Sequence, residues 1–237
     1  MLTPDSTPRV SSEPGHLTDL HDGTAMTIGT PGASPATTRG RSRWAGAALV
    51  TGSFVLLLYV IEAVDVASGL ALDRHGIGPR SIDGLQGIAF APLLHHGWDH
   101  LFANTGPLLV LGFVLMLSGI GRGLAVTAVV WIVGGLGTWL TGATASLHVG
   151  ASIVVFGWLS YLIVRGVFAR DMKQLLVGVV VLFVYGSALW GVLPTQEDVS
   201  WQGHLFGALA GILAAWMFAG HARRERSAPI TVQQRLS

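Results

Sequence analysis

Three groups of polar residues lie beside apolar stretches of this sequence, and together they hold the side chains that a hydrolase needs. His100 and Asn104 are four residues apart, so they lie on one face of a helix, one turn from each other. Ser152 stands directly before a long apolar run, and His204 opens another apolar run that contains no charged residue. A serine hydroxyl beside an imidazole is a nucleophile beside its general base, which is the activation used in serine hydrolysis.

Each of these residues also has a simpler structural explanation. Ser152 can cap the free amides of a helix start, and histidines at a helix end can simply meet water. A further alternative is a metal site, because two ligands at this spacing with a carboxylate nearby can form half of one. The candidate ligands of a zinc hydrolase are His95, His96, Asp99, His100 and His204.

Small residues surround both members of the candidate pair. Gly150 and Ala151 leave room for another backbone beside Ser152, and the free amides of a helix start can stabilise a developing oxyanion. Gly207 and Gly211 lie on the same helical face as His204.

Together with Gly203, these two glycines make two overlapping GxxxG steps, a pattern typical of close helix contacts in membranes. Close packing on this face brings the imidazole of His204 near the neighbouring helix. If that helix begins at Ser152, the two side chains can form a hydrogen bond, with a looser contact allowed in a substrate-free enzyme.

Composition places these residues in a membrane protein. Of the 237 residues, 51% are hydrophobic and 11% are charged, and the mean hydropathy is +0.58; a soluble domain carries about 25% charge. Six apolar segments each approach the roughly 20 residues that cross a bilayer, and helices are expected because lipid offers no partners to free backbone groups. The fold class is therefore an all-α membrane protein with six transmembrane helices, at 44–64, 100–117, 124–140, 150–167, 175–193 and 203–220.

The chain divides into a membrane domain at 41–222 and two tails. Residues 1–40 contain five of the ten prolines and no apolar periodicity, so we expect a disordered N-terminal tail. Residues 223–237 form a short C-terminal tail. Basic residues favour the cytoplasmic side, which puts both tails in the cytoplasm and all three polar groups at the outer ends of their helices. These basic residues are Arg39, Arg41, Arg43, Arg122, Arg165, Arg170, Lys173, Arg223, Arg224 and Arg226.

Charge and cysteine content exclude several classes. A net charge of +1 does not fit a nucleic-acid binder. With no cysteine, the chain has no disulfide, iron–sulfur cluster or cysteine-ligated zinc.

In these motifs the sequence resembles the rhomboid family of intramembrane serine proteases, over roughly residues 44–220. The matching stretches occur in the order that the family shows, at the second, fourth and sixth apolar segments, and at the same depth in the membrane. They are residues 91–98, His95-x4-His100-x3-Asn104, Gly150-Ala151-Ser152 and the run 201–207.

The resemblance implies a role for each residue. Ser152 is the nucleophile and His204 the general base of a dyad without an acidic member. The oxyanion hole is formed by the Ser152 amide with His100 and Asn104, while His95 has a supporting role. The reaction is hydrolysis of peptide bonds in or near transmembrane segments of protein substrates, through an acyl-enzyme, with no metal or cofactor, in a bacterial inner membrane.

One residue departs from the family pattern. Ile153 follows the serine where the family usually has glycine, and its branched side chain could crowd the neighbouring helix or narrow the substrate site. Two further alternatives stay open: an inactive relative that binds transmembrane helices without cutting them, and a transporter whose polar path is lined by His100, Asn104 and His204. Substrate identity and oligomeric state are not specified by the sequence.

Overall fold

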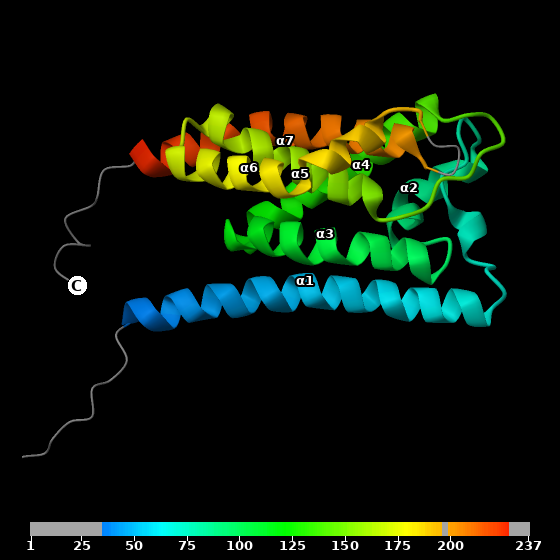
Figure 1. Cartoon of the computed structure of the whole chain (residues 1–237), viewed down its shortest axis with the longest axis horizontal. Helices are drawn as coiled ribbons and strands as arrows, with labels where there is room; N and C mark the ends of the chain where they lie inside the picture. The colour runs from blue at the N-terminus through cyan, green and yellow to red at the C-terminus, as the bar shows by residue number, and fades with distance from the viewer. Residues whose placement is uncertain (1–34, 196–198, 228–237) are drawn as a thin grey trace, which may run out of the picture. The chain divides into compact units, whose positions relative to one another are not determined.

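The computed structural model describes residues 35–195 and 199–227, and within them the side chains of 41–195 and 199–220. Six helices of this part are long and apolar enough to cross a membrane (Figure 1). The predicted all-α fold with six transmembrane helices is confirmed, and no strand occurs among the described residues. The spans are α1 (Pro35–Ala67), α3 (Trp98–Leu117), α4 (Ile120–Thr141), α5 (Ser152–Ala169), α6 (Met172–Tyr185) with its continuation η4 (Gly186–Val192), and α7 (Trp201–Ser227).

Several boundaries differ from the sequence-based ones. α1 begins at Pro35, so residues 35–40 are helical, while the rest of the predicted N-terminal tail lies outside the described residues. The fifth span is α-helical only to Tyr185 and then narrows to a 3₁₀ helix. α7 continues to Ser227, beyond the predicted end of the membrane domain.

One basic residue also has a different place. Arg165, expected between two spans, lies inside α5, where it is buried. Its guanidinium donates to the Ser118 hydroxyl and lies over the Tyr161 ring. These partners explain how a charge is tolerated inside a span.

α5 is the central helix of the bundle and the most buried of the six spans. It contacts α3, α4, α6 and α7. Small residues on α5 suit this position, because an ideal Cβ on Gly157 would lie 2.2 Å from the Val130 side chain of α4, and one on Gly166 would lie 2.3 Å from the backbone of Leu175 in α6. α1 instead packs mainly against α3 (Figure 1).

Glycines bring α5 and α7 into backbone contact. An ideal Cβ on Gly207 would lie 2.4 Å from the carbonyl oxygen of Ile153, and one on Gly211 would lie 2.1 Å from that of Gly157. The Ser160 hydroxyl donates across the same contact to the carbonyl of Ala208, at 2.7 Å. The GxxxG face therefore packs against the helix that begins at Ser152.

The segment between α1 and α3 is folded onto the C-terminal end of α4. It contains η1 (Asp73–His75), η2 (Asp83–Gln86), α2 (Gly87–Phe90) and η3 (Ala91–Leu93). The Arg80 guanidinium donates to the carbonyls of Leu140 and Gly142 at 3.1 and 2.7 Å. The Trp139 indole donates to the carbonyl of Ser81 at 2.9 Å. The two Arg80 bonds satisfy free carbonyls at the helix end, and the Trp139 bond ties the segment to the same end of α4.

We predict that Gly207→Ala separates α5 from α7 and destabilises the protein by about 1–3 kcal/mol, as overpacking of a tight contact does. Thermal unfolding in detergent should show a clearly lower melting temperature. The matched control is Gly220→Ala on the same helix, where an ideal Cβ meets nothing within 4 Å. Equal melting temperatures for the two variants would contradict the close contact.

Candidate active site

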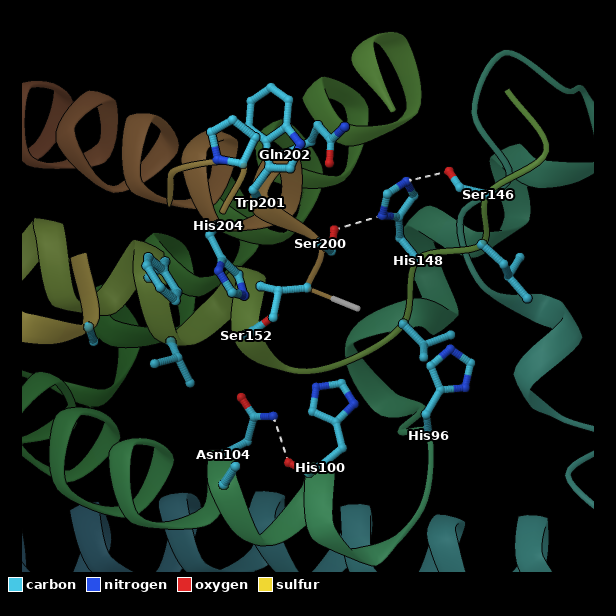
Figure 2. A pocket seen from close by; sticks show the side chains of 18 of the residues that line it. His96, His100, Asn104, Ser146, His148, Ser152, Ser200, Trp201, Gln202 and His204 are labelled. Atoms are coloured by element: carbon cyan, nitrogen blue, oxygen red, sulfur yellow. Dashed lines mark hydrogen bonds between the residues drawn. The ribbon is translucent and has the colours of Figure 1, made fainter. Parts of the chain in front are cut away.

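A cavity of about 1100 Å³ collects the side chains that the sequence predicts as nucleophile, general base and oxyanion donors (Figure 2). Its lining includes the side chains of His100 and Asn104 from α3, Ser152 from α5 and His204 from α7. The N-terminal ends of these three helices lie at one end of the bundle (Figure 1). The fold therefore brings the three polar groups together.

Two contacts fix the ring of His204. It stacks on Phe156, with 4.0 Å between ring centroids and 8° between ring planes. Its Nδ1 lies 2.8 Å from the carbonyl oxygen of Gly191 in η4. A carbonyl only accepts, so Nδ1 carries the hydrogen and Nε2 keeps its lone pair.

Ser152 and His204 both line the cavity, but the described residues include no hydrogen bond between them. Phe156 is one turn after Ser152 on α5, so the ring stacked on it lies over the helical face that carries the serine. The expected direct bond is thus absent, while the two side chains share one face of α5 and one cavity.

The turn before Ser152 is held in an unusual conformation. Gly150 has a φ of +119°, and an ideal Cβ on it would lie 2.6 Å from the His100 ring. Its N–H donates to the carbonyl of Ala91 at 2.8 Å, and the Ala151 N–H donates to Nε2 of His95 at 3.3 Å. Glycine is required here by backbone conformation and by space.

His95 supports this turn from the segment before α3. Its side chain is 0% exposed, and burial lowers the pKa of His95 to about 3, so the ring is neutral near neutral pH. A neutral ring is what the contact needs, because only an unprotonated Nε2 can accept the Ala151 N–H.

His100 and Asn104 lie on α3, across the cavity from the start of α5 (Figure 2). The Asn104 amide donates to the carbonyl of His100 at 2.9 Å, which orients its NH₂ group. The His100 ring lies edge-on to that of His95, with centroids 5.2 Å apart.

The side chains considered as zinc ligands do not gather. His96 pairs with Asp73, with 2.9 Å between Nδ1 and Oδ2, and Asp99 is exposed. The described part of the chain holds no group of three or more His, Asp or Glu side chains placed to bind a metal ion.

The family of the chain follows from comparison with known proteins. A model of the Rhomboid domain matches residues 84–221, more than half of the chain. The chain belongs to the rhomboid family. The resemblance seen in the motifs is thereby confirmed.

The relatives of this rhomboid are mostly uncharacterised proteins. One from Mycobacterium tuberculosis is 47% identical over 217 residues, which are 86% of this chain and 90% of the relative. One from Mycobacterium leprae is 44% identical over 198 residues, 80% of this chain and 78% of the relative. A Bacillus subtilis protein whose name assigns it provisionally to the rhomboid proteases is 26% identical over 131 residues, 53% of this chain and 63% of the relative. No solved structure matches the chain.

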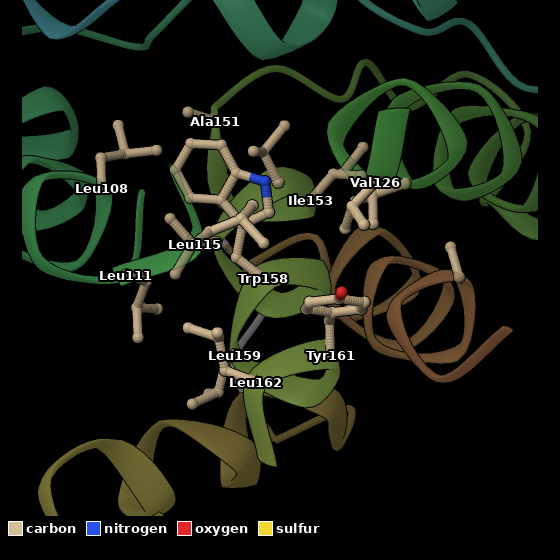
Figure 3. Packing of buried hydrophobic residues seen from close by; sticks show 14 of the residues in the cluster. Leu108, Leu111, Leu115, Val126, Ala151, Ile153, Trp158, Leu159, Tyr161 and Leu162 are labelled. Atoms are coloured by element: carbon tan, nitrogen blue, oxygen red, sulfur yellow. The ribbon is translucent and has the colours of Figure 1, made fainter. Parts of the chain in front are cut away.

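Ile153 points into the protein interior of this rhomboid, where it belongs to the buried hydrophobic cluster (Figure 3). Its side chain packs against Gly134 of α4 and against Gly203 of α7. It does not belong to the lining of the cavity. Glycines on the neighbouring helices thus make the room that the branched side chain takes.

Sequence reasoning missed four residues of the candidate site. Phe156 could have been found, because it lies one turn after Ser152 on the same helical face. The other three could not be found in this way. Gly191 lies in a 3₁₀ helix, while His148 and Ser200 lie in segments without a helical period. His148 and Ser200 hydrogen-bond to each other at 2.7 Å beside the cavity.

We predict that this rhomboid loses stability as the pH falls from about 6.5 towards 3. The pKa of His95 is lower in the folded than in the unfolded protein, so the unfolded state binds more protons in this range. One such group changes the free energy of unfolding by at most about 1.4 kcal/mol per pH unit. Thermal unfolding in detergent at several pH values measures this slope.

The control for this prediction is His95→Gln, whose amide oxygen can still accept the Ala151 N–H but does not titrate. It should lower the pH dependence while it keeps the fold. A slope as steep as that of the wild type would show that His95 is not the group responsible.

Proposed function

We propose that this rhomboid is an intramembrane serine endopeptidase that hydrolyses peptide bonds in or near transmembrane segments of membrane proteins. The observation that carries the proposal is the orientation of His204. The Phe156 ring and the Gly191 carbonyl hold the imidazole so that Nε2 is its only unbound nitrogen, in the cavity that Ser152 also lines. A base with its lone pair beside a serine hydroxyl is what nucleophilic hydrolysis requires.

In the first half of the reaction, Ser152 Oγ attacks the carbonyl carbon of the scissile bond while Nε2 of His204 takes the hydroxyl proton. The tetrahedral intermediate then expels the amine, which receives that proton, and leaves an ester on Ser152. In the second half, water attacks the ester with His204 again as the base. Release of the acid regenerates the free serine.

The negative oxygen of the intermediate needs donors that are in place beforehand. The Ser152 amide lies in the first turn of α5, where backbone N–H groups have no partner within the helix. His100 and Asn104 line the same cavity and are the proposed side-chain donors, while His95, Gly150 and Ala151 shape the turn that presents the serine. Such donors stabilise charge that appears only in the transition state.

The proposed topology follows the distribution of arginine. Both termini lie in the cytoplasm, and the cavity opens toward the extracytoplasmic face of the cell membrane. Substrate helices then reach the cavity through the lipid bilayer.

The first test is cleavage of a model transmembrane substrate by the protein in liposomes. Wild type should cleave it, and Ser152→Ala and His204→Ala should each abolish cleavage, since either removes the nucleophilic pair. Ser53→Ala, an exposed serine on α1, is the matched control and should keep full activity. A chelator should have no effect.

Two results would contradict the proposal. Cleavage that survives in Ser152→Ala would require another mechanism. A wild type that neither cleaves the substrate nor reacts at Ser152 with a fluorophosphonate would favour the inactive relative that only binds helices, because labelling requires an activated hydroxyl.

A second prediction concerns the oxyanion donors. Asn104→Ala should lower kcat by about 100- to 1000-fold, the usual effect of removing one such donor. KM should change little, since the donor acts on charge absent from the bound substrate. An unchanged kcat for Asn104→Ala would remove this residue from the oxyanion hole.

A further inference from the structure

His148 and Ser200 link the segment before Ser152 to the first turn of the helix that carries His204. His148 lies four residues before the serine, and Ser200 lies four residues before the histidine. The Nδ1 atom of His148 is 2.7 Å from Ser200 Oγ, and its Nε2 is 2.9 Å from Ser146 Oγ (Figure 2). The link joins the two chain segments that hold the proposed dyad.

The direction of each bond follows from its neighbours. The Ser146 hydroxyl donates its hydrogen to the carbonyl of Ala143 at 2.7 Å, so it must accept from Nε2–H of His148. A neutral imidazole has one N–H, so Nδ1 accepts from the Ser200 hydroxyl.

Ser200 in turn caps the start of α7. Its Oγ accepts the Gly203 N–H at 3.3 Å, and its carbonyl accepts the His204 N–H at 3.1 Å. The position of Ser200 therefore sets the position of the first turn of α7, on which the imidazole of His204 stands.

The backbone of His148 is itself anchored. Its N–H and C=O both bond to Ile77, at 3.1 and 2.9 Å, in the only β-bridge of the described residues. Its side chain is buried, and burial lowers the pKa of His148, which keeps the ring neutral and able to accept. Both ring nitrogens are occupied, so His148 is not itself available as a base.

We propose that His148 is a positioning residue, which holds the start of α7 through Ser200 and so keeps the imidazole of His204 in register with the hydroxyl of Ser152. The inference rests on the proposed protease function. Packing through Gly207 and Gly211 fixes the distance between the helix axes farther along α7, whereas the His148–Ser200 bond fixes the end of α7 at the cavity.

Two substitutions separate the two bonds of His148. In His148→Asn, the amide oxygen stands near the former Nδ1 and can accept from Ser200, while the bond to Ser146 is lost. In His148→Gln, the amide nitrogen stands near the former Nε2 and can donate to Ser146, while the bond to Ser200 is lost. The second pair is Ser200→Ala, which loses the hydroxyl, and Ser200→Thr, which keeps it.

The readouts are the rate of fluorophosphonate labelling at Ser152, kcat and KM for the model substrate, and the melting temperature in detergent. His148→Gln and Ser200→Ala should lower kcat and the labelling rate by about 10- to 100-fold, since a displacement near 1 Å can cost 100-fold. KM and the melting temperature should stay close to wild type. His148→Asn and Ser200→Thr should retain most of the rate.

Different results overturn the inference and the proposed function. Wild-type rates in His148→Gln, or equal losses in His148→Asn and His148→Gln, would overturn the positioning role while labelling at Ser152 still supports the protease. A fall in rate that only follows the melting temperature would mean a structural role and would also overturn it. Cleavage that persists in Ser152→Ala would overturn the protease function, and the inference with it.

Discussion

The backbone contact between α5 and α7 is the constraint on which the rest of the site depends. Gly207 and Gly211 let α7 approach the carbonyls of Ile153 and Gly157 so closely that no side chain fits between them. Lipid tails are as apolar as the side chains of the helices, so moving such a side chain from lipid into a helix contact gains no hydrophobic free energy. Close packing and hydrogen bonds, such as that from Ser160, must therefore hold the helices together. The same face of α7 that packs on α5 carries His204, so the contact that assembles the bundle also assembles the candidate site.

Much of this architecture follows from composition and spacing, because the bilayer allows few alternatives. Long apolar runs must be helices, and alternate helices must start on the same side, so the amino-acid sequence alone predicts that His100, Ser152 and His204 lie at one end of the bundle. The GxxxG spacing identifies the contacting face of α7 but not its partner, since any helix with small residues could accept it. Only the fold shows that the partner is α5.

The rest of the site could not be derived because it depends on segments without periodicity. The Gly191 carbonyl reaches His204 from a 3₁₀ helix, where the sequence predicts a continuous span. His148 reaches Ser200 from a loop whose place is set by its pairing with Ile77, far away in the sequence. Ile153 shows the same limit, since its effect depends on glycines of two other helices.

These contacts also suggest how the proposed dyad of Ser152 and His204 would work without an acid. In a triad, a carboxylate holds the imidazole in the correct tautomer and stabilises its charged form. Here the Gly191 carbonyl selects the Nδ1–H tautomer of His204, and the face of Phe156, 4.0 Å away, offers its negative quadrupole to the imidazolium that forms during the proposed reaction. A neutral carbonyl and an aromatic face carry no net charge, so neither must be desolvated as an ion to lie within a membrane helix bundle. An acid at this place would add attraction for the imidazolium but would bring its own cost of burial, which the arrangement around His204 avoids.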